Sequence, residues 1–252
     1  MIYIVLGMHK SGTTLISRIL HESGINMGEF DASVSYDKGN QYEREEFQII
    51  NKEILKCGNA HSTDVIEPLK GSYLNDEFTG SINAIEKQLN VEYDNWGFKD
   101  PRTCLTYSFW NTNLPDHQLI YVFRSPIEIW NHYRKKIPKY RMLKRFIASY
   151  KAVKAWYIYN NEAFNIVADS SKKQYLIEYS EFMNSKQSIE RLSEFIGVTL
   201  KDSRDPNLYR AKSTAGIGYK FYIFVAKYLF AKDIDKLFDN LSKLQNNKGQ
   251  SL

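Results

Sequence analysis

The chain has 252 residues, of which 43% are hydrophobic, and can bury one large core as a single domain. Its 34 basic and 29 acidic residues give a net charge of +5, which is too small to indicate a nucleic-acid-binding protein. Its two cysteines, Cys57 and Cys104, exclude a disulfide framework and belong to no metal-spacing pattern, so we expect chemistry without a protein-bound metal.

The first expected strand, at residues 2–6, leads into a glycine loop and a helix. Gly7 and Gly12 bracket the loop sequence MHKS. In such a strand, loop and helix, main-chain N–H groups and the positive end of the helix dipole point at one anion. The spacing is close to GxxxxGK[ST], but Thr13 stands where the lysine would follow the second glycine, and Lys10 lies inside the loop. The loop therefore predicts a phosphate site with its ammonium group shifted towards the leaving end of a nucleotide.

A second anion-binding residue is expected after the strand at residues 118–123, where Arg124 follows and Pro126 opens a helix. Open α/β sheets bind ligands at the carboxyl ends of their strands. A guanidinium group suits a terminal phosphate because it donates two parallel hydrogen bonds. Taken alone, Arg124 would more often be interpreted as a surface salt-bridge partner.

The other expected strands lie near residues 95–98 and 174–178. Helices are expected near residues 13–23, 42–57, 79–89, 103–112, 126–136, 142–167 and 186–196. Strands that alternate with longer helices indicate a parallel sheet with crossovers. We therefore expect a three-layer, P-loop-like α/β fold with a central, mainly parallel sheet flanked by helices. It would form one domain over residues 1–252, with 213–252 as a C-terminal helical extension.

Together these segments resemble the sulfotransferases that use 3′-phosphoadenosine 5′-phosphosulfate (PAPS), in particular the bacterial GMHRSGTS and KDPR type. Residues 7–14 read GMHKSGTT, residues 124–126 read RSP as in the 3′-phosphate motif, and residues 99–102 read KDPR. The resemblance covers most of the first 200 residues. It implies metal-independent, in-line transfer of a sulfonate group from PAPS to a hydroxyl or amine, with 3′-phosphoadenosine 5′-phosphate (PAP) as the product.

The resemblance also assigns the donor site. Lys10 would stabilise the charge on the departing oxygen. The residues expected to hold the donor are His9, Lys10, Ser11, Gly12, Thr13, Thr14, Arg124, His132, Tyr179 and Arg210. Many members carry a serine at position 132, so His132 either donates a ring N–H to the 3′-phosphate or the role is lost. Tyr179 matches a family tyrosine that approaches the adenine, and the alternative is that it packs at a strand end. Arg210 lies where related enzymes close a loop over the 3′-phosphate, but the match is loose.

An acceptor hydroxyl needs a base to take its proton. Glu43 stands where the carbohydrate and tyrosyl-protein branches place a glutamate base and is the first choice, with Glu46 one helical turn away. Asp100 is a third candidate for the catalytic base. Next to Lys99 and Arg102, which are expected on the substrate side, Asp100 is also interpreted as a structural ion-pair partner.

Two other functions stay open from the sequence. A P-loop nucleotide kinase or NTPase would need a lysine after Gly12 and an acidic strand end to hold Mg²⁺. A catalytically silent nucleotide-binding module is the other alternative. The expected acceptor is a glycan, a lipid or a small molecule. The basic run at residues 134–145 and the aromatic tail favour a sugar or a lipid-linked sugar.

The apolar segment at residues 217–231 is interrupted by Lys220 and Lys227 and is too short to span a bilayer. A packed terminal helix is the first interpretation, and a helix lying on a membrane surface is the second. Only five apolar residues precede Gly7 and no basic segment comes before them, which does not match a secretory signal. We expect a cytoplasmic protein, with peripheral membrane association as the alternative.

Overall fold

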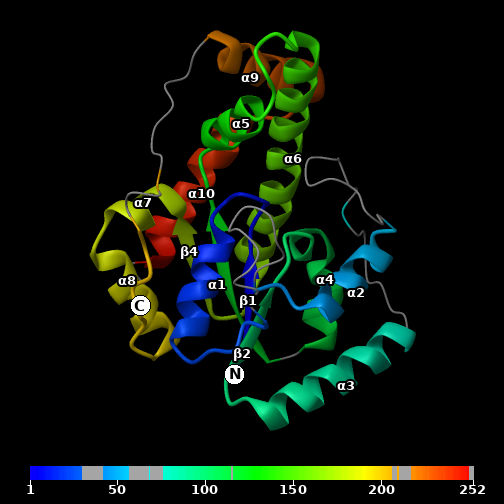
Figure 1. The fold of residues 1–252 in the computed structure, drawn as a ribbon, viewed down its shortest axis with the longest axis vertical. Helices are drawn as coiled ribbons and strands as arrows, with labels where there is room; N and C mark the ends of the chain where they lie inside the picture. Colours follow the sequence, from blue (N-terminus) through cyan, green and yellow to red (C-terminus); the bar gives the residue numbers. More distant parts are fainter. Residues whose placement is uncertain are drawn as a thin grey trace.

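The computed structural model describes residues 1–29, 42–56, 68, 76–114, 116–205, 209 and 217–249. Within them, four strands form an all-parallel sheet in the order β2-β1-β3-β4 (Figure 1). The strands are β1 (Ile2–Leu6), β2 (Trp96–Lys99), β3 (His117–Phe123) and β4 (Gln174–Glu178). Every residue of β1 and β2 is buried, as expected for a parallel sheet covered on both faces.

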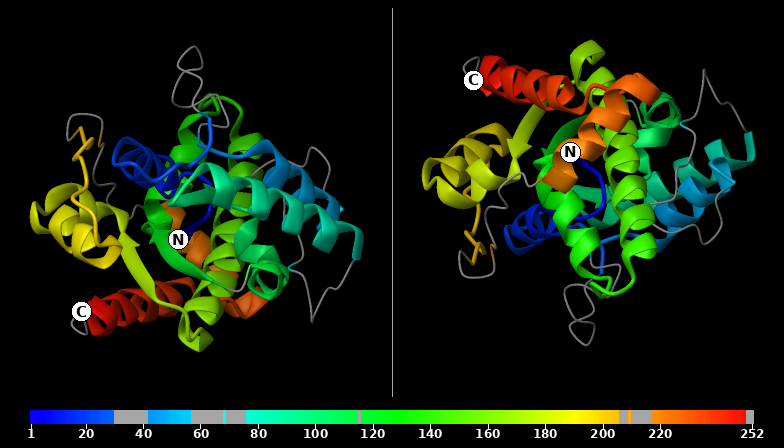
Figure 2. Two further views of the ribbon diagram at one scale, coloured as in Figure 1. Left: turned by 90° about the horizontal axis from the view of Figure 1, so that it is seen from below. Right: turned by 90° about the horizontal axis from the view of Figure 1, so that it is seen from above.

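Helices cover both faces of the sheet (Figure 2). They are α1 (Thr13–Glu22), α2 (Glu45–Ile54), α3 (Asp76–Glu92), α4 (Thr103–Asn113), α5 (Pro126–Lys135), α6 (Met142–Asp169), α7 (Tyr179–Asn184), α8 (Gln187–Ile196), α9 (Ile217–Phe230) and α10 (Ile234–Gly249). Because side chains alternate along a strand, Ile4 packs in the core with α2, α4 and α6, whereas Val5 packs in the core with α1 and α8. The expected three-layer α/β fold is confirmed.

The predicted strands agree with the structure to within one residue, but three helices differ. The helix expected near residues 79–89 is longer and spans Asp76–Glu92. The helix expected near residues 42–57 begins only at Glu45, because Tyr42 has a φ of +56° and Arg44 is extended. It ends at Ile54, so Cys57 lies outside it and outside the described residues. The short α7 (Tyr179–Asn184) was not predicted.

The strand register brings four connections to one edge of the sheet. Val5 pairs with Lys99, Leu6 with Tyr121, and Phe123 with Glu178, so the carboxyl ends of all four strands lie side by side. The segments that follow are the glycine loop, the KDPR segment, Arg124 and Tyr179. The fold therefore gathers the predicted site at this edge.

The C-terminal helices pack on the rest of the molecule. Gln245 of α10 accepts a hydrogen bond from the main-chain N–H of Glu178 over 2.8 Å, on the outer edge of β4. On α9, the Tyr219 ring lies 5.6 Å from that of Trp130 on α5. A packed terminal helix at residues 217–230 thus agrees with the first interpretation, while the division into a domain and an extension stays a prediction.

In the described part of the chain, no helix combines the length and the apolar character needed to cross a membrane.

Candidate active site

The glycine loop ends at a helix N-terminus whose N-cap residue, a glycine, provides no side-chain cap. Gly12 is the N-cap of α1 with a φ of +105°, and the first turn of α1 contains no acidic residue. The first N–H groups of a helix have no partner within it, and the dipole makes this end positive. Ser11 closes the loop, because its main-chain N–H and its hydroxyl both donate to the Met8 carbonyl, over 3.2 and 2.5 Å. This helix end suits an anion.

Lys10 adopts a φ of +68°, which is uncommon for a residue with a side chain. Its carbonyl oxygen accepts a hydrogen bond from Nη1 of Arg124 over 3.3 Å. Arg124 follows β3 directly, and its own carbonyl accepts from Nε1 of Trp156 over 2.9 Å. The loop after β1 and the residue after β3 are thus tied together by direct contact.

Tyr179 links the loop and Arg124. The guanidinium carbon of Arg124 lies 4.9 Å from the centre of the Tyr179 ring, a cation–π distance. A Cβ atom on Gly12 would lie 2.1 Å from Cδ2 of Tyr179, so only glycine fits there. Burial raises the pKa of Tyr179 and keeps its phenol neutral. Lys10, Gly12, Arg124 and Tyr179 form one surface, which we call the donor cluster.

Glu128 is a member of this region that the sequence analysis missed. Its Oε2 accepts from Nε of Arg124 over 2.6 Å, and its Oε1 accepts from the Tyr209 hydroxyl over 3.1 Å. The four-residue spacing from Arg124 was the available signal. His132 follows Glu128 by one helical turn, so these two residues share one side of α5, whereas Arg124 precedes the helix.

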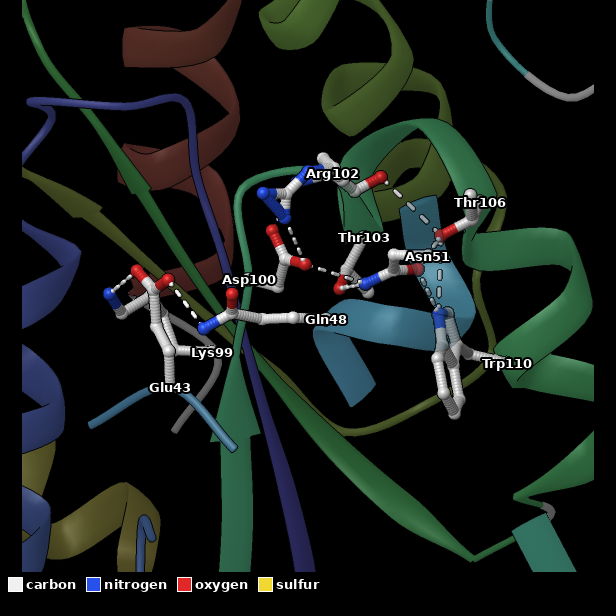
Figure 3. A network of polar contacts seen from close by, with 9 residues as sticks. All are labelled: Glu43, Gln48, Asn51, Lys99, Asp100, Arg102, Thr103, Thr106 and Trp110. Carbon is white, nitrogen blue, oxygen red and sulfur yellow. Dashed lines mark hydrogen bonds and ion pairs between the residues drawn. The ribbon is translucent and has the colours of Figure 1, made fainter. Parts of the chain in front are cut away.

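A second polar group lies at the end of β2 (Figure 3). Lys99 forms an ion pair with Glu43, and the side chains are 3% and 13% exposed, respectively. Nε2 of Gln48 donates to Oε2 of Glu43 over 3.1 Å. Burial raises the pKa of Glu43, and the attraction to Lys99 opposes this only in part. Glu43 is therefore a partly buried carboxyl group whose proton affinity is increased.

Asp100 is fully buried and surrounded by donors. It accepts from the Arg102 main-chain N–H over 3.0 Å, from Nη1 of Arg102 over 2.8 Å, and from Nδ2 of Asn51 over 3.1 Å. Asn51, also fully buried, joins α2 to α4, because its Oδ1 accepts from Oγ1 of Thr106 over 2.5 Å and from Nε1 of Trp110 over 2.8 Å. This network, which sequence reasoning missed, holds the KDPR segment in place (Figure 3).

Glu46 lies in a different environment from Glu43. Its side chain is 39% exposed, and its Oε1 lies 3.9 Å from Nη1 of Arg44. Arg44 donates from Nε to the carbonyl of Gly97 over 3.1 Å, on the outer edge of β2. Glu46 therefore lies beside the edge strand and not in the network of Figure 3.

Three other predicted residues have separate positions. His9 lies in the loop, with its ring centre 6.0 Å from that of Tyr159 on α6. Thr13, in the first turn of α1, is buried. Arg210 lies outside the described residues. Among the residues that the structure describes, no group of three or more His, Cys, Asp or Glu side chains is arranged to hold a metal ion.

A model of the sulfotransferase family matches residues 3–202, which include the donor cluster and the network of Figure 3. The chain belongs to the sulfotransferase family. This is an enzyme family, and its members use PAPS as the donor.

Two solved structures of sulfotransferase domains are similar to this sulfotransferase. One is from the Synechococcus PCC 7002 olefin synthase, with 11% identity over 90% of this chain and 94% of that chain and a TM-score of 0.49. The other is from the curacin biosynthetic pathway, with 14% identity over 97% of this chain and 96% of that chain and a TM-score of 0.46. No curated protein matches the chain.

The donor cluster of this sulfotransferase fits a nucleotide with phosphate groups at both ends. The uncapped N-terminus of α1 suits one phosphate. The guanidinium of Arg124 suits the other, because its hydrogen bonds to the described residues use two of its five N–H donors. The buried Tyr179 ring packs against both Gly12 and Arg124 and so holds the two anion-binding positions together.

Proposed function

We propose that this sulfotransferase moves a sulfonate group from PAPS to a hydroxyl or amine of a carbohydrate or a lipid-linked glycan, by in-line transfer without a metal. The observation that carries the proposal is the contact between Arg124 and the Lys10 carbonyl. It supports two anion-binding sites close enough to bind one nucleotide. The bound donor supplies an activated sulfonate group next to its 5′-phosphate.

Lys10 is the proposed cation at the leaving group. Its position within the loop, before Gly12, places it next to the uncapped end of α1. A cation held there beforehand stabilises charge that develops during bond breaking more than charge already present in the ground state. Both donors of Ser11 already bind the Met8 carbonyl, so main-chain N–H groups and hydroxyls of residues 12–14, without the expected Ser11, would hold the 5′-phosphate. Arg124 would hold the 3′-phosphate, so that the donor has a fixed direction.

Glu43 is the proposed base. Its raised pKa makes it a better proton acceptor than an exposed glutamate. From the described residues, each of its two oxygens accepts one hydrogen bond, from Lys99 or from Gln48, and a carboxylate oxygen has a second lone pair that suits an acceptor hydroxyl. The contacts of Asp100 support a positioning role, because three donors from Arg102 and Asn51 already surround its carboxylate.

The test of donor use is a thermal-shift experiment with PAP and with ATP, each with and without Mg²⁺. Stabilisation by PAP without Mg²⁺ is the expected result, since a ligand that binds only the folded state raises its stability. Stabilisation by ATP with Mg²⁺ alone would instead support a nucleotide kinase. A screen with radiolabelled PAPS against extracted glycans, lipids and small metabolites then tests the acceptor class.

A further inference from the structure

One end of the molecule exposes a group of large apolar side chains. It is formed by the start of α6, the turn before it and the outer side of α9 (Figure 1). Eight side chains there are 46–78% exposed, and we call them the apolar face: Tyr140, Met142, Leu143, Phe146, Ile147, Phe221, Phe224 and Tyr228. The rings of Phe146 and Phe221 lie 6.4 Å apart, so the two helices contribute to one continuous surface.

The helix α9 is apolar on two opposite sides. Tyr219, Tyr222 and Ala226 face inwards and are buried. Phe221, Phe224 and Tyr228 repeat the same spacing two residues further on and face outwards. A helix with apolar residues all round is normally buried on all sides. The outer side of α9 therefore has the composition of a surface that is covered by something else.

The charges around the apolar face are basic. No acidic residue occurs at positions 129–161 or 206–232. The exposed basic side chains nearby in the chain are Arg134, Lys135, Lys136, Lys139, Arg141, Lys144, Lys220 and Lys227, and Lys227 forms an ion pair with Asp233. A second copy of the chain at this face would bring like charges together, which disfavours self-association there.

We propose that the apolar face docks on a lipid bilayer with anionic headgroups. Aromatic and aliphatic side chains on one side of a helix enter the boundary between headgroups and acyl chains. Lysine and arginine reach the lipid phosphates while their stems stay in apolar surroundings. The exposed aromatic rings of the apolar face suit the headgroup boundary, and the surrounding positive charges suit the lipid phosphates. α9 would lie along the surface of the bilayer without crossing it.

The docked orientation brings the candidate active site towards the bilayer. α5 begins two residues after Arg124 and ends at Lys135, next to the basic residues, and its 10 residues span about 15 Å. The carboxyl edge of the sheet and the apolar face thus lie at the two ends of one short helix. A lipid-linked acceptor would suit an active site held close to the bilayer. This choice of acceptor depends on the proposed function, whereas the docking on the bilayer does not.

The test is sedimentation of the full chain with vesicles, which needs neither donor nor acceptor. Phosphatidylcholine vesicles are compared with vesicles that also contain phosphatidylglycerol, at low and at high salt. We expect strong binding only to the anionic vesicles, and weaker binding at high salt because ions screen the attraction. Equal binding to both vesicle types, or no binding to either, would overturn the proposal. Binding to soluble polyglutamate but not to vesicles would also overturn it and indicate an acidic protein partner.

Variants separate the apolar and the basic contributions. A Lys139→Gln/Arg141→Gln/Lys144→Gln variant should lose roughly a hundredfold in vesicle affinity, at about fivefold for each basic residue. A Phe221→Ser/Phe224→Ser/Tyr228→Ser variant should lose at least about tenfold. Because these side chains are exposed, both variants should melt close to the parent protein.

Matched controls use similar residues elsewhere on the surface. Val91→Ser/Val198→Ser removes exposed apolar side chains, and Lys87→Gln/Lys186→Gln/Lys243→Gln removes exposed positive charge. Both controls should bind vesicles as the parent does. If the controls lost as much vesicle affinity as the variants of the apolar face and its basic residues, the docking would not be specific to this face. If the α9 variant does not fold, Met142→Ser/Leu143→Ser in the first turn of α6 tests the same face.

Discussion

Nη1 of Arg124 donates a hydrogen bond to the main-chain carbonyl of Lys10 over 3.3 Å, which joins the end of β3 to the loop after β1. Lys10 has a positive φ, a conformation that persists only when its surroundings hold it. The contact helps to hold it and also brings two cationic residues to one edge of the sheet. Two neighbouring cations and an uncapped helix N-terminus together favour the binding of an anion with more than one charged group.

Substitution of Lys10 and of Arg124 should affect different steps. Lys10→Ala should lower single-turnover rates by about a hundredfold to a thousandfold, because it removes a charge that acts mainly in the transition state. Its affinity for PAP should change much less. Arg124→Ala should weaken PAP binding by about tenfold to a hundredfold, since it removes charged hydrogen bonds. Single-turnover assays measure the rate and binding titrations measure the affinity for PAP, with Lys87→Ala as the exposed control. A loss of affinity in Lys10→Ala together with a loss of rate in Arg124→Ala would reject the proposed roles.

The pH dependence of turnover tests Glu43. A base acts as the carboxylate, and burial raises the pKa of Glu43, so turnover should rise as the pH increases through that raised pKa. Glu43→Gln should lower turnover by about a hundredfold or more and remove this rise. Glu46→Gln changes the more exposed glutamate beside Arg44 and should leave both the turnover and its rise with pH unchanged. Full activity of Glu43→Gln on the true acceptor would exclude Glu43 as the base.

Asn51 should be important for stability. Asn51→Ala leaves Asp100 without one of its donors and Trp110 without its nearest acceptor, both in buried positions. We expect the free energy of unfolding to fall by about 2–4 kcal/mol. Asn184→Ala, which removes an exposed hydrogen bond to the Ser180 carbonyl, should cost less than about 0.5 kcal/mol. Denaturant unfolding measures both, and equal losses would show that the network contributes no special stability.

Gly12 tests the fit between the loop and Tyr179. Gly12→Ala would place a Cβ atom 2.1 Å from the Tyr179 ring at a φ of +105°. Gly24→Ala is the matched control, because Gly24 has a φ of +92° but no atom within 4 Å of the added Cβ. Gly12→Ala should therefore be less stable than Gly24→Ala by about 1–3 kcal/mol. In a Tyr179→Ala background this difference should disappear, and its persistence would contradict the contact.

The sequence predicted the centre of the sheet well because β1 and β3 are short, mostly apolar runs that are buried almost throughout, which local composition specifies. The glycine loop and Arg124 could be placed at one edge, because parallel strands end together. Their direct contact could not be predicted, since it joins residues 114 positions apart.

The pairing of the site residues was harder to predict than their identity. Lys99 could be recognised in the KDPR segment, but its ion pair with Glu43 depends on how α2 packs beside β2. Asn51 was missed because its role depends on hydrogen bonds to four residues that are distant in the sequence. An asparagine within an amphipathic helix does not by itself indicate such partners. α7 was missed because six residues are too few for a helical period to appear.

A crystal structure with PAP bound would locate both phosphates of the nucleotide. We expect the 5′-phosphate on the main-chain N–H groups at Gly12–Thr14 with the Lys10 ammonium beside it, and the 3′-phosphate on Arg124. The Glu128 carboxylate would then share the guanidinium with that phosphate. PAP bound at any other place, or with only one of its two ends in the donor cluster, would show that Lys10 and Arg124 do not bind one nucleotide together.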